Sequence, residues 1–261
     1  MIKNCNSVIN TNTNPCIDQH KKCDNMKRPF IFFDLGQTLI NEWGFIDYFD
    51  MRFFEMLNGF GARINFRNYQ TIRDNVIRNR KIGHGSVREL IIEVCKLICQ
   101  QGYGKIILER LEPELKEARR NFFCLFDDAE QTMNSLLIQY DLGIIANQSV
   151  DILKILEESK INRFFKVIVI SSEVKVRKPD PEIFRLAMNL ANTSPEHCIM
   201  VGDRLDTDIG PANKLGMKTI RITNSLFKLQ QPMNEFEKPT YVVANLSEIA
   251  NILDKLSPPD L

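Results

Sequence analysis

The sequence has no long apolar run and no excess of charge of one sign, and both absences restrict its function. None of its apolar runs approaches the roughly 18–20 residues that a helix needs to cross a bilayer. The 34 basic and 33 acidic residues leave a formal net charge of +1, which gives no electrostatic case for a nucleic-acid or membrane partner. With 44% hydrophobic and 26% charged residues, the composition is that of an ordinary soluble globular protein.

The N-terminal segment lacks an apolar stretch of signal-peptide length, so we expect a cytoplasmic protein. We predict a disordered tail over residues 1–27, because this segment is polar and low in complexity. The chain has seven cysteines, an odd number, which are expected to stay reduced in the cytoplasm. No ordinary zinc-site spacing relates the potential ligands of the tail, which are Cys5, Cys16, His20 and Cys23.

Short apolar runs bounded by polar residues recur along the chain and are typical of buried strands in a parallel sheet. They cover residues 29–33, 142–146, 167–170, 198–201, 219–222 and 241–243. Helix-period patterns separate them, over residues 128–140, 150–158, 181–192, 206–215 and 246–256. This alternation predicts an α/β fold with a doubly wound, mostly parallel Rossmann-like sheet, and such sheets bind ligands at the carboxyl ends of their strands.

The segment 42–125 interrupts the alternation. It has helix-period patterns over 49–57, 67–79, 87–99 and 105–123, with glycines between them and no convincing strand. An all-helical insertion directly after the first strand indicates a separate cap domain. We therefore predict a cap over 42–125 and a core domain formed by 28–41 and 126–261.

An aspartate closes the first predicted strand. The carboxylate of Asp34 would project into the crevice above the sheet, where it could act as a nucleophile or hold a metal ion. Taken alone, an aspartate after a strand is just as compatible with a turn or a helix cap.

Three more aspartates follow the strand predicted over 198–201. Asp203 comes directly after Gly202, and Asp206 and Asp208 open the next helix. Clustered carboxylates repel one another unless a cation lies among them, and Mg²⁺ prefers hard oxygen ligands. The alternative is that Asp206 and Asp208 only favour a helix N-terminus through its dipole, and we assign that role to Asp206.

A lysine between two constrained segments is the third informative position. Lys178 precedes Pro179-Asp180-Pro181, and a proline suits the first turn of a helix. A lone lysine is usually a solvated surface charge, but one held in a crevice with carboxylates is a plausible partner for a phosphate.

Taken together, FDLGQTL at 33–39, KPDPEIF at 178–184 and GDRLDTDI at 202–209 resemble three motifs of the haloacid dehalogenase (HAD) superfamily, in the expected order. The resemblance covers residues 28–256, and the helical insertion looks like a C1-type cap of that superfamily. It implies a Mg²⁺-dependent hydrolase that acts on a small phosphorylated metabolite through an aspartyl nucleophile.

The resemblance also implies roles for single residues. Asp34 would be the nucleophile, and Lys178 would neutralise it and the bound phosphoryl group. Mg²⁺ would be held by Asp34, the carbonyl of Gly36, Asp203 and Asp208. The residues implied in substrate binding are Thr38, Asn147 and Lys178.

Two positions depart from the phosphatase pattern. Gly36 stands where the family has a second aspartate, whose acid–base role is worth roughly 10²–10⁴-fold in rate. Ala146 stands where the family has a serine or threonine, and losing one positioned donor costs on the order of 10²-fold. Ser149 is a candidate to replace the lost hydroxyl. The candidates to replace the missing acid are Glu42, Lys81 and His84.

These departures leave two other functions open. One is a non-catalytic protein that binds a phosphorylated ligand on the same fold. The other is a hydrolase that cleaves a phosphonate or a carbon–halogen bond. In a phosphonate-cleaving enzyme, a cap lysine such as Lys81 would form a Schiff base with the substrate. Dehalogenases need no metal, so the presence of Asp203 and Asp208 argues against a dehalogenase. Trp43, at the predicted hinge, either contacts substrate or packs between cap and core. The sequence predicts neither the physiological substrate nor the oligomeric state.

Overall fold

The computed structural model describes residues 28–99 and 102–254. The tail predicted over 1–27 therefore lies outside the described residues. The core of the molecule is a six-stranded sheet with the order β3-β2-β1-β4-β5-β6, in which every neighbouring pair is parallel. Its strands are β1 (Phe30–Phe33), β2 (Asp141–Ala146), β3 (Val167–Ile170), β4 (Cys198–Gly202), β5 (Lys218–Ile222) and β6 (Tyr241–Val243). The predicted doubly wound α/β sheet is confirmed.

Strand β1 lies at the centre of the sheet and is buried on both faces. Alternate side chains point to opposite faces, so Ile31 and Phe33 join one hydrophobic cluster while Phe30 and Phe32 join another. The amide of Asp34 continues the pairing with β4, because it donates to the carbonyl of Val201 at 2.9 Å. This register brings the residues that follow β1 and β4 to the same edge of the sheet.

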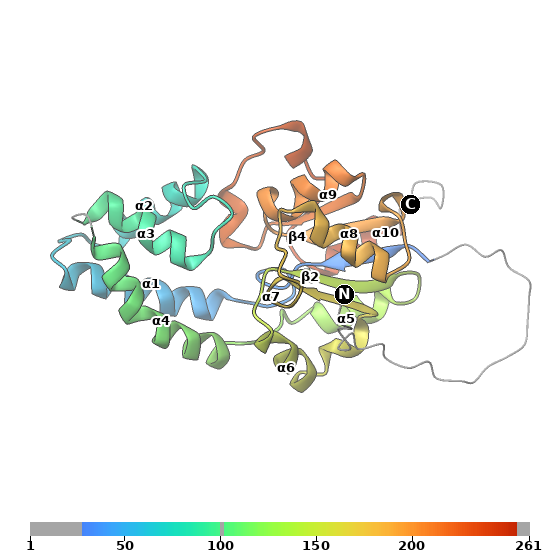
Figure 1. Cartoon of the computed structure of the whole chain (residues 1–261), viewed down its shortest axis with the longest axis horizontal. Helices are drawn as coiled ribbons and strands as arrows, with labels where there is room; N and C mark the ends of the chain where they lie inside the picture. The colour runs from blue at the N-terminus through green and yellow to red at the C-terminus, as the bar shows by residue number, and fades with distance from the viewer. Residues whose placement is uncertain (1–27, 100–101, 255–261) are drawn as a thin grey trace, which may run out of the picture.

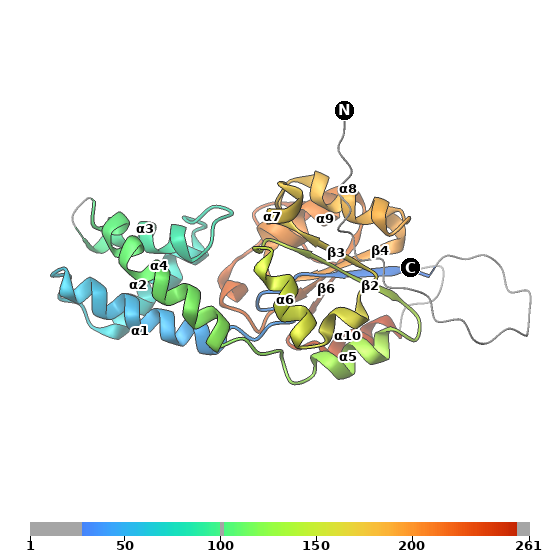
Figure 2. The same cartoon turned by 60° about the horizontal axis from the view of Figure 1, so that its bottom comes forward.

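Helices cover both faces of the sheet (Figure 2). On one face pack α5 (Ala129–Leu136), α6 (Asp151–Glu158) and α10 (Ser247–Leu253), and on the other α8 (Pro181–Leu190) and α9 (Gly210–Leu215). The helix predicted over 206–215 has two parts: a π-helical turn at Leu205–Ile209 leads into α9. The remaining short helices are α7 (Ser171–Val174) and 3₁₀ turns at Ile161–Phe164, Pro195–His197, Leu226–Leu229 and Glu235–Glu237.

The inserted segment forms four helices beside the carboxyl ends of the strands (Figure 1). They are α1 (Trp43–Gly59), α2 (Phe66–Arg78), α3 (Val87–Ile98) and α4 (Tyr103–Asn121). Their apolar faces build a hydrophobic cluster separate from those of the sheet. Local signals set where helices begin: Asn65 caps α2 by accepting from the amide of Asn68, and Ser86 and Glu89 form a capping box on α3.

The two connections between the helical unit and the sheet run side by side. Ile40 pairs with Leu125 as an antiparallel bridge, and the amide of Asn41 donates to the carbonyl of Cys124 at 2.9 Å. The boundaries at 42 and 125 stay a prediction. Within the described residues, no helix has the length and apolarity needed to cross a membrane.

Candidate active site

Three aspartates meet at the carboxyl ends of β1 and β4. One carboxylate oxygen from each of Asp34, Asp203 and Asp208 lies within 4.8 Å of the other two. Asp208 comes close because Gly202 has no side chain: a Cβ at Gly202 would lie 2.6 Å from the Cβ of Asp208. All three line one pocket, where Asp203 and Asp208 are almost completely buried and Asp34 is partly exposed.

Lys178 lies among these carboxylates and is only 1% exposed. Its Nζ donates to Oδ1 of Asp34 and to Oδ1 of Asp208, both at 2.6 Å. The side chain of Asn147 binds the backbone of Lys178 through two hydrogen bonds. Its Nδ2 donates to the Lys178 carbonyl at 2.9 Å, and its Oδ1 accepts from the Lys178 amide at 2.8 Å. The Asn147 amide thus fixes the backbone that presents the ammonium group.

Burial and repulsion by neighbouring carboxylates make Asp203 and Asp208 reluctant to ionise. Burial, reinforced by Asp208 and Asp34, raises the pKa of Asp203 well above its usual range. Burial also raises the pKa of Asp208 to about 6, although Lys178 opposes the shift. Burial lowers the pKa of Lys178, but the two carboxylates outweigh this effect and leave its pKa raised.

The donor set fits a hard divalent cation. Three carboxylates lie close together and the Lys178 ammonium pairs with two of them, Asp34 and Asp208, so the cluster carries excess negative charge when it is ionised. Carboxylate oxygens are the ligands that Mg²⁺ prefers, and a cation among them would offset the repulsion that contributes to the raised pKa values of Asp203 and Asp208. The hydroxyl of Ser225 donates to Oδ2 of Asp203 and so fixes the orientation of that carboxylate.

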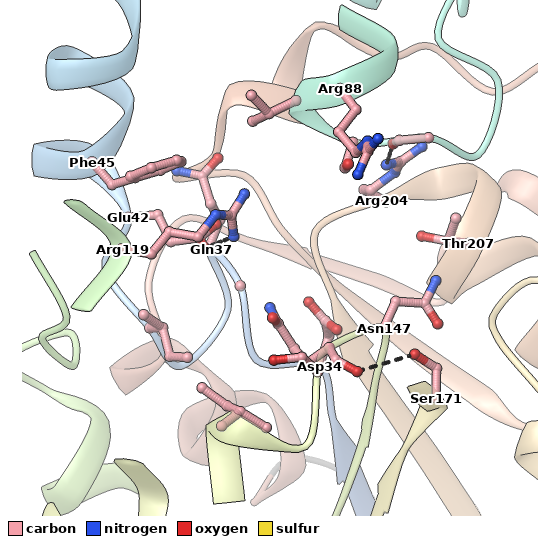
Figure 3. A pocket seen from close by; sticks show the side chains of 18 of the residues that line it. Asp34, Gln37, Glu42, Phe45, Arg88, Arg119, Asn147, Ser171, Arg204 and Thr207 are labelled. Atoms are coloured by element: carbon pink, nitrogen blue, oxygen red, sulfur yellow. Dashed lines mark hydrogen bonds and ion pairs between the residues drawn. The ribbon is translucent and has the colours of Figure 1, made fainter. Parts of the chain in front are cut away.

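Asp34 and Lys178 line the floor of a pocket of about 920 Å³ between the sheet and the helical unit (Figure 3). On the side of the helical unit, the pocket is lined by residues of α1, α2, α3, α4 and the loop before α3. Cavities of this size accommodate small organic ligands. Four cap cations face the pocket: Arg88, Lys116, Arg119 and Arg120.

Two arginines bridge the loop before α3 to the core. Arg204 donates from Nη1 to the carbonyl of Gly85 at 2.7 Å and from Nη2 to the carbonyl of Gly83 at 3.1 Å. Arg80 forms an ion pair with Glu237 at 2.6 Å. These contacts hold the helical unit against the sheet and enclose one side of the pocket.

The hinge before α1 brings a further carboxyl group to the site. Figure 3 shows Glu42, Arg119 and Gln37 grouped above Asp34. The Glu42 carboxylate lies 3.7 Å from Nη1 of Arg119. Burial raises the pKa of Glu42, Arg119 lowers it, and Asp34 raises it further, so that the net shift is upward.

Residues 31–222 match the family model described as haloacid dehalogenase-like hydrolase. The chain belongs to this family. Membership of this family explains why the three motifs occur in this order, and it identifies the protein as a hydrolase.

Curated relatives in the family include proteins named as phosphatases. The chain is 25% identical to glyceraldehyde 3-phosphate phosphatase of Methanocaldococcus jannaschii, over 87% of this chain and 97% of that protein. It is 37% identical to the Methanopyrus kandleri protein of the same name, but this match spans only 42% of that protein's length. It is 27% identical to pyrimidine 5′-nucleotidase YjjG of Escherichia coli, over 88% of this chain and 100% of that protein.

Solved structures of HAD-like proteins share the fold at lower identity. The putative HAD-hydrolase YfnB from Bacillus subtilis, bound to magnesium, is 22% identical with a TM-score of 0.62, covering 88% of this chain and 100% of that one. A predicted phosphoglycolate phosphatase from Haemophilus somnus is 19% identical with a TM-score of 0.64 and the same coverage of both chains.

The structure brings together most, but not all, of the site residues predicted from the HAD motifs. Asp34, Lys178, Asp203, Asp208 and Asn147 converge, and Gly36 lines the pocket. Thr38 is fully buried and does not line the pocket, and its hydroxyl has no hydrogen-bond partner among the described residues. Its contact with substrate, like that of Asn147, stays a prediction.

The candidate replacements for the missing groups lie in different surroundings. Glu42 and His84 line the pocket, whereas Lys81 is exposed and does not. Ser149 lines the pocket but is exposed. Trp43 does not line the pocket and donates from Nε1 to Oδ1 of Asn224 at 3.2 Å, which favours its packing role.

Four residues of the site were not predicted, although two of them, Gln37 and Arg204, lie within the quoted motifs. They are Gln37, Arg119, Arg204 and Ser225. Gln37 is 2% exposed and lines the pocket; its Oε1 accepts from the Leu226 amide at 2.6 Å, and its Nε2 has no partner in the described part of the chain. Each contact depends on how a distant loop folds back, so no local spacing marks these positions.

Proposed function

We propose that this chain is a Mg²⁺-dependent phosphatase that acts on a small phosphorylated metabolite, with Asp34 as its nucleophile. The observation that carries the proposal is the contact between Asp34 and the buried ammonium of Lys178 at the floor of the pocket. An anionic nucleophile and a dianionic phosphate repel each other, and a fixed cation reduces that barrier. The names of two relatives that align over almost the whole chain, a phosphatase and a 5′-nucleotidase, support the same reaction class.

Each residue of the site has a defined part in this reaction. A carboxylate oxygen of Asp34 attacks phosphorus, and Lys178 offsets negative charge on the nucleophile and on the phosphoryl oxygens. Asp34, Asp203, Asp208 and the carbonyl of Gly36 would hold Mg²⁺, which, when bound, supplies further positive charge at the phosphoryl group. Asn147 fixes Lys178.

The helical unit and the surroundings of the protein complete the proposal. We assign residues 42–125 to a cap that excludes water from the pocket, and 28–41 with 126–261 to the catalytic core. Thr38 and Asn147 keep their proposed part in substrate binding. Because the charges of the chain are balanced, we propose a small-molecule substrate and no nucleic-acid or membrane partner. We also propose a cytoplasmic location.

Hydrolysis of p-nitrophenyl phosphate tests this function, since nitrophenolate leaves with little need for a proton. We expect Mg²⁺-dependent turnover that is lost in Asp34→Asn. The matched control is Asp141→Asn, which removes an aspartate at the opposite end of the sheet. Turnover that is unaffected by Asp34→Asn or by chelation of Mg²⁺ contradicts the proposal.

A second candidate is a non-catalytic protein that binds a phosphorylated ligand at the same site. Two observations favour it: position 36 has no side chain, and position 146 is an alanine. Absence of turnover combined with thermal stabilisation by Mg²⁺ plus inorganic phosphate would support this candidate over the phosphatase.

A further inference from the structure

Hydrolysis of an alkyl phosphate needs an acid that the residues assigned above do not supply. An alkoxide is a poor leaving group, so its oxygen must receive a proton as the bond to phosphorus breaks. Asp34, Asp203 and Asp208 are committed to attack and to the acidic cluster. The residue two positions after Asp34, which follows it into the pocket, is Gly36 and carries no acid.

A carboxylate from another element fills the space beside Gly36. A Cβ built on Gly36 would lie 3.0 Å from Oε2 and 3.6 Å from Oε1 of Glu42. The Glu42 carboxylate therefore lies where a side chain at position 36 would point, and it lines the same pocket as Asp34, above which Figure 3 shows it. Glu42 is one of the three replacements expected from the sequence, and the turn of the chain between β1 and α1 brings its carboxylate to this place.

We propose that Glu42 is the acid and base of the reaction, protonating the leaving group and then activating water. This inference rests on the proposed phosphatase function and adds the group that makes unactivated substrates reactive. Glu42 has the reach for the task because its side chain is 24% exposed, in contact with the pocket, and not closed off in the core.

The other ionisable groups of the pocket are less suited to this role. Glu112 also lines the pocket, but it is paired with Arg88 at 2.7 Å and its side chain is half exposed. Asp151 is exposed in the first turn of α6. His84 is exposed in the loop before α3.

Arg119 positions Glu42. Its guanidinium lies 3.7 Å from Oε1 of Glu42 and stacks over the ring of Phe45, at 4.5 Å from the centroid. The backbone of Glu42 is fixed as well, because its carbonyl accepts from the amide of Ile46 in the first turn of α1, at 2.8 Å. Arg119 thus orients the carboxylate of Glu42, and the first turn of α1 fixes its backbone.

The reaction proceeds in two balanced steps. A carboxylate oxygen of Asp34 forms a bond to phosphorus, the bond from phosphorus to the ester oxygen breaks with its electron pair going to that oxygen, and the oxygen takes the proton of Glu42. In the second step Glu42 accepts a proton from water while the water oxygen bonds to phosphorus. The bond between Asp34 and phosphorus breaks and returns its electron pair to the Asp34 carboxylate, so that alcohol and phosphate leave and Glu42 is protonated again.

The test compares two leaving groups in Glu42→Gln, with Glu117→Gln as the matched control. Glu117 is an exposed glutamate of α4 that does not line the pocket. We expect kcat for glycerol 2-phosphate to fall by roughly 10²–10⁴-fold in Glu42→Gln. With p-nitrophenyl phosphate the first step persists and the second slows, so a burst of nitrophenolate precedes a slow steady state, and phosphorylated protein accumulates in intact mass spectra.

A rescue variant separates chemistry from folding. Combining Glu42→Ala with Gly36→Asp removes the carboxylate that a side chain at position 36 would meet and puts another in its place. We expect this double variant to hydrolyse glycerol 2-phosphate at least about tenfold faster than Glu42→Ala alone, a small part of the 10²–10⁴-fold acid–base contribution.

The outcomes distinguish this inference from the proposed function. Wild-type protein without Asp34-dependent turnover overturns both. Asp34-dependent turnover of p-nitrophenyl phosphate leaves the function standing. In that case the inference for Glu42 fails if Glu42→Gln hydrolyses glycerol 2-phosphate as fast as Glu117→Gln, or loses the same factor on both substrates without a burst.

Discussion

Lys178 and Asp208 form an ion pair that is sealed from solvent. Their side chains are 2% and 1% exposed, and Nζ lies 2.6 Å from Oδ1. Taking both charges out of water is costly, so such a pair is retained only where its geometry and its further partners are good. The same ammonium also contacts Asp34. One buried group therefore both stabilises the core, by pairing with Asp208, and positions the carboxylate of the proposed nucleophile.

Lys178→Met should destabilise the protein markedly. The variant leaves Asp34 and Asp208 without the ammonium that pairs with both, and breaking a buried ion pair in this way costs about 3–5 kcal/mol. Urea denaturation at neutral pH measures the change. Adding Asp208→Asn to Lys178→Met should recover part of the loss, and equal stability of Lys178→Met and wild type would contradict the buried pairing.

Protons and Mg²⁺ should compete for the acidic cluster. The pKa of Asp208 is raised from 3.8 to about 6, so between these values the folded protein holds this proton more tightly than the unfolded chain does. Ionisation in the fold is therefore unfavourable, and the metal-free protein should lose stability as the pH rises through this window. A cation among the ionised carboxylates removes that penalty.

The thermal shift produced by Mg²⁺ should consequently be larger at about pH 7.5 than at about pH 5. Melting curves with Mg²⁺ and with a chelator, at both pH values, measure it. Asp203→Asn should abolish most of the shift at the higher pH. A shift of the same size at both pH values in the wild type would contradict proton–metal competition.

The ion pair between Arg80 and Glu237 should couple cap closure to catalysis. Both side chains are only 11% exposed, although they belong to the helical unit and to the sheet domain. We expect a double-mutant cycle of Arg80→Gln and Glu237→Gln to give a coupling of about 0.5–3 kcal/mol in unfolding. Each single variant should raise KM more than it lowers kcat, because a loosened cap binds substrate less well. The same cycle on the exposed pair Arg88 and Glu112 is expected to give a smaller coupling.

Ala146→Ser should accelerate the enzyme. Ala146 ends β2 directly before Asn147, at the edge of the sheet where Asp34 lies, and a hydroxyl there would add a donor for a phosphoryl oxygen. We expect kcat for p-nitrophenyl phosphate to rise by up to about 10²-fold. Ala187→Ser, at a buried alanine of α8, controls for the cost of burying a hydroxyl. A rate no higher than that of the control would show that position 146 does not face the phosphoryl group.

The fold and the residues at the floor of the site could be predicted from the sequence, because both depend on local patterns. Buried apolar runs such as Phe30–Phe33 set the strands, and the order of strands and helices brings Asp34, Lys178 and Asp203 to one edge. The predicted helix over 206–215 was only partly right, since a π-helical turn at Leu205–Ile209 accommodates the approach of Asp208 to Gly202.

The contacts in the upper part of the site could not be predicted from local patterns. The contact of Glu42 with the space beside Gly36 depends on the turn between β1 and α1, and the contacts of Arg204 with Gly83 and Gly85 depend on how the cap docks. The spacing of these residues along the chain predicts neither the approach of Glu42 to Gly36 nor the contacts of Arg204 with Gly83 and Gly85. Tertiary packing alone creates them.

Phosphate transfer to Asp34 is the most direct consequence of the proposed chemistry. Brief reaction of the wild-type protein with p-nitrophenyl phosphate and Mg²⁺, followed by acid quenching and peptide mass spectrometry, should reveal a phosphoryl group on the peptide that contains Asp34. The same treatment of Asp34→Asn should give none. Turnover without phosphate on that peptide, or phosphate on another residue, would contradict the assignment of Asp34 as the nucleophile.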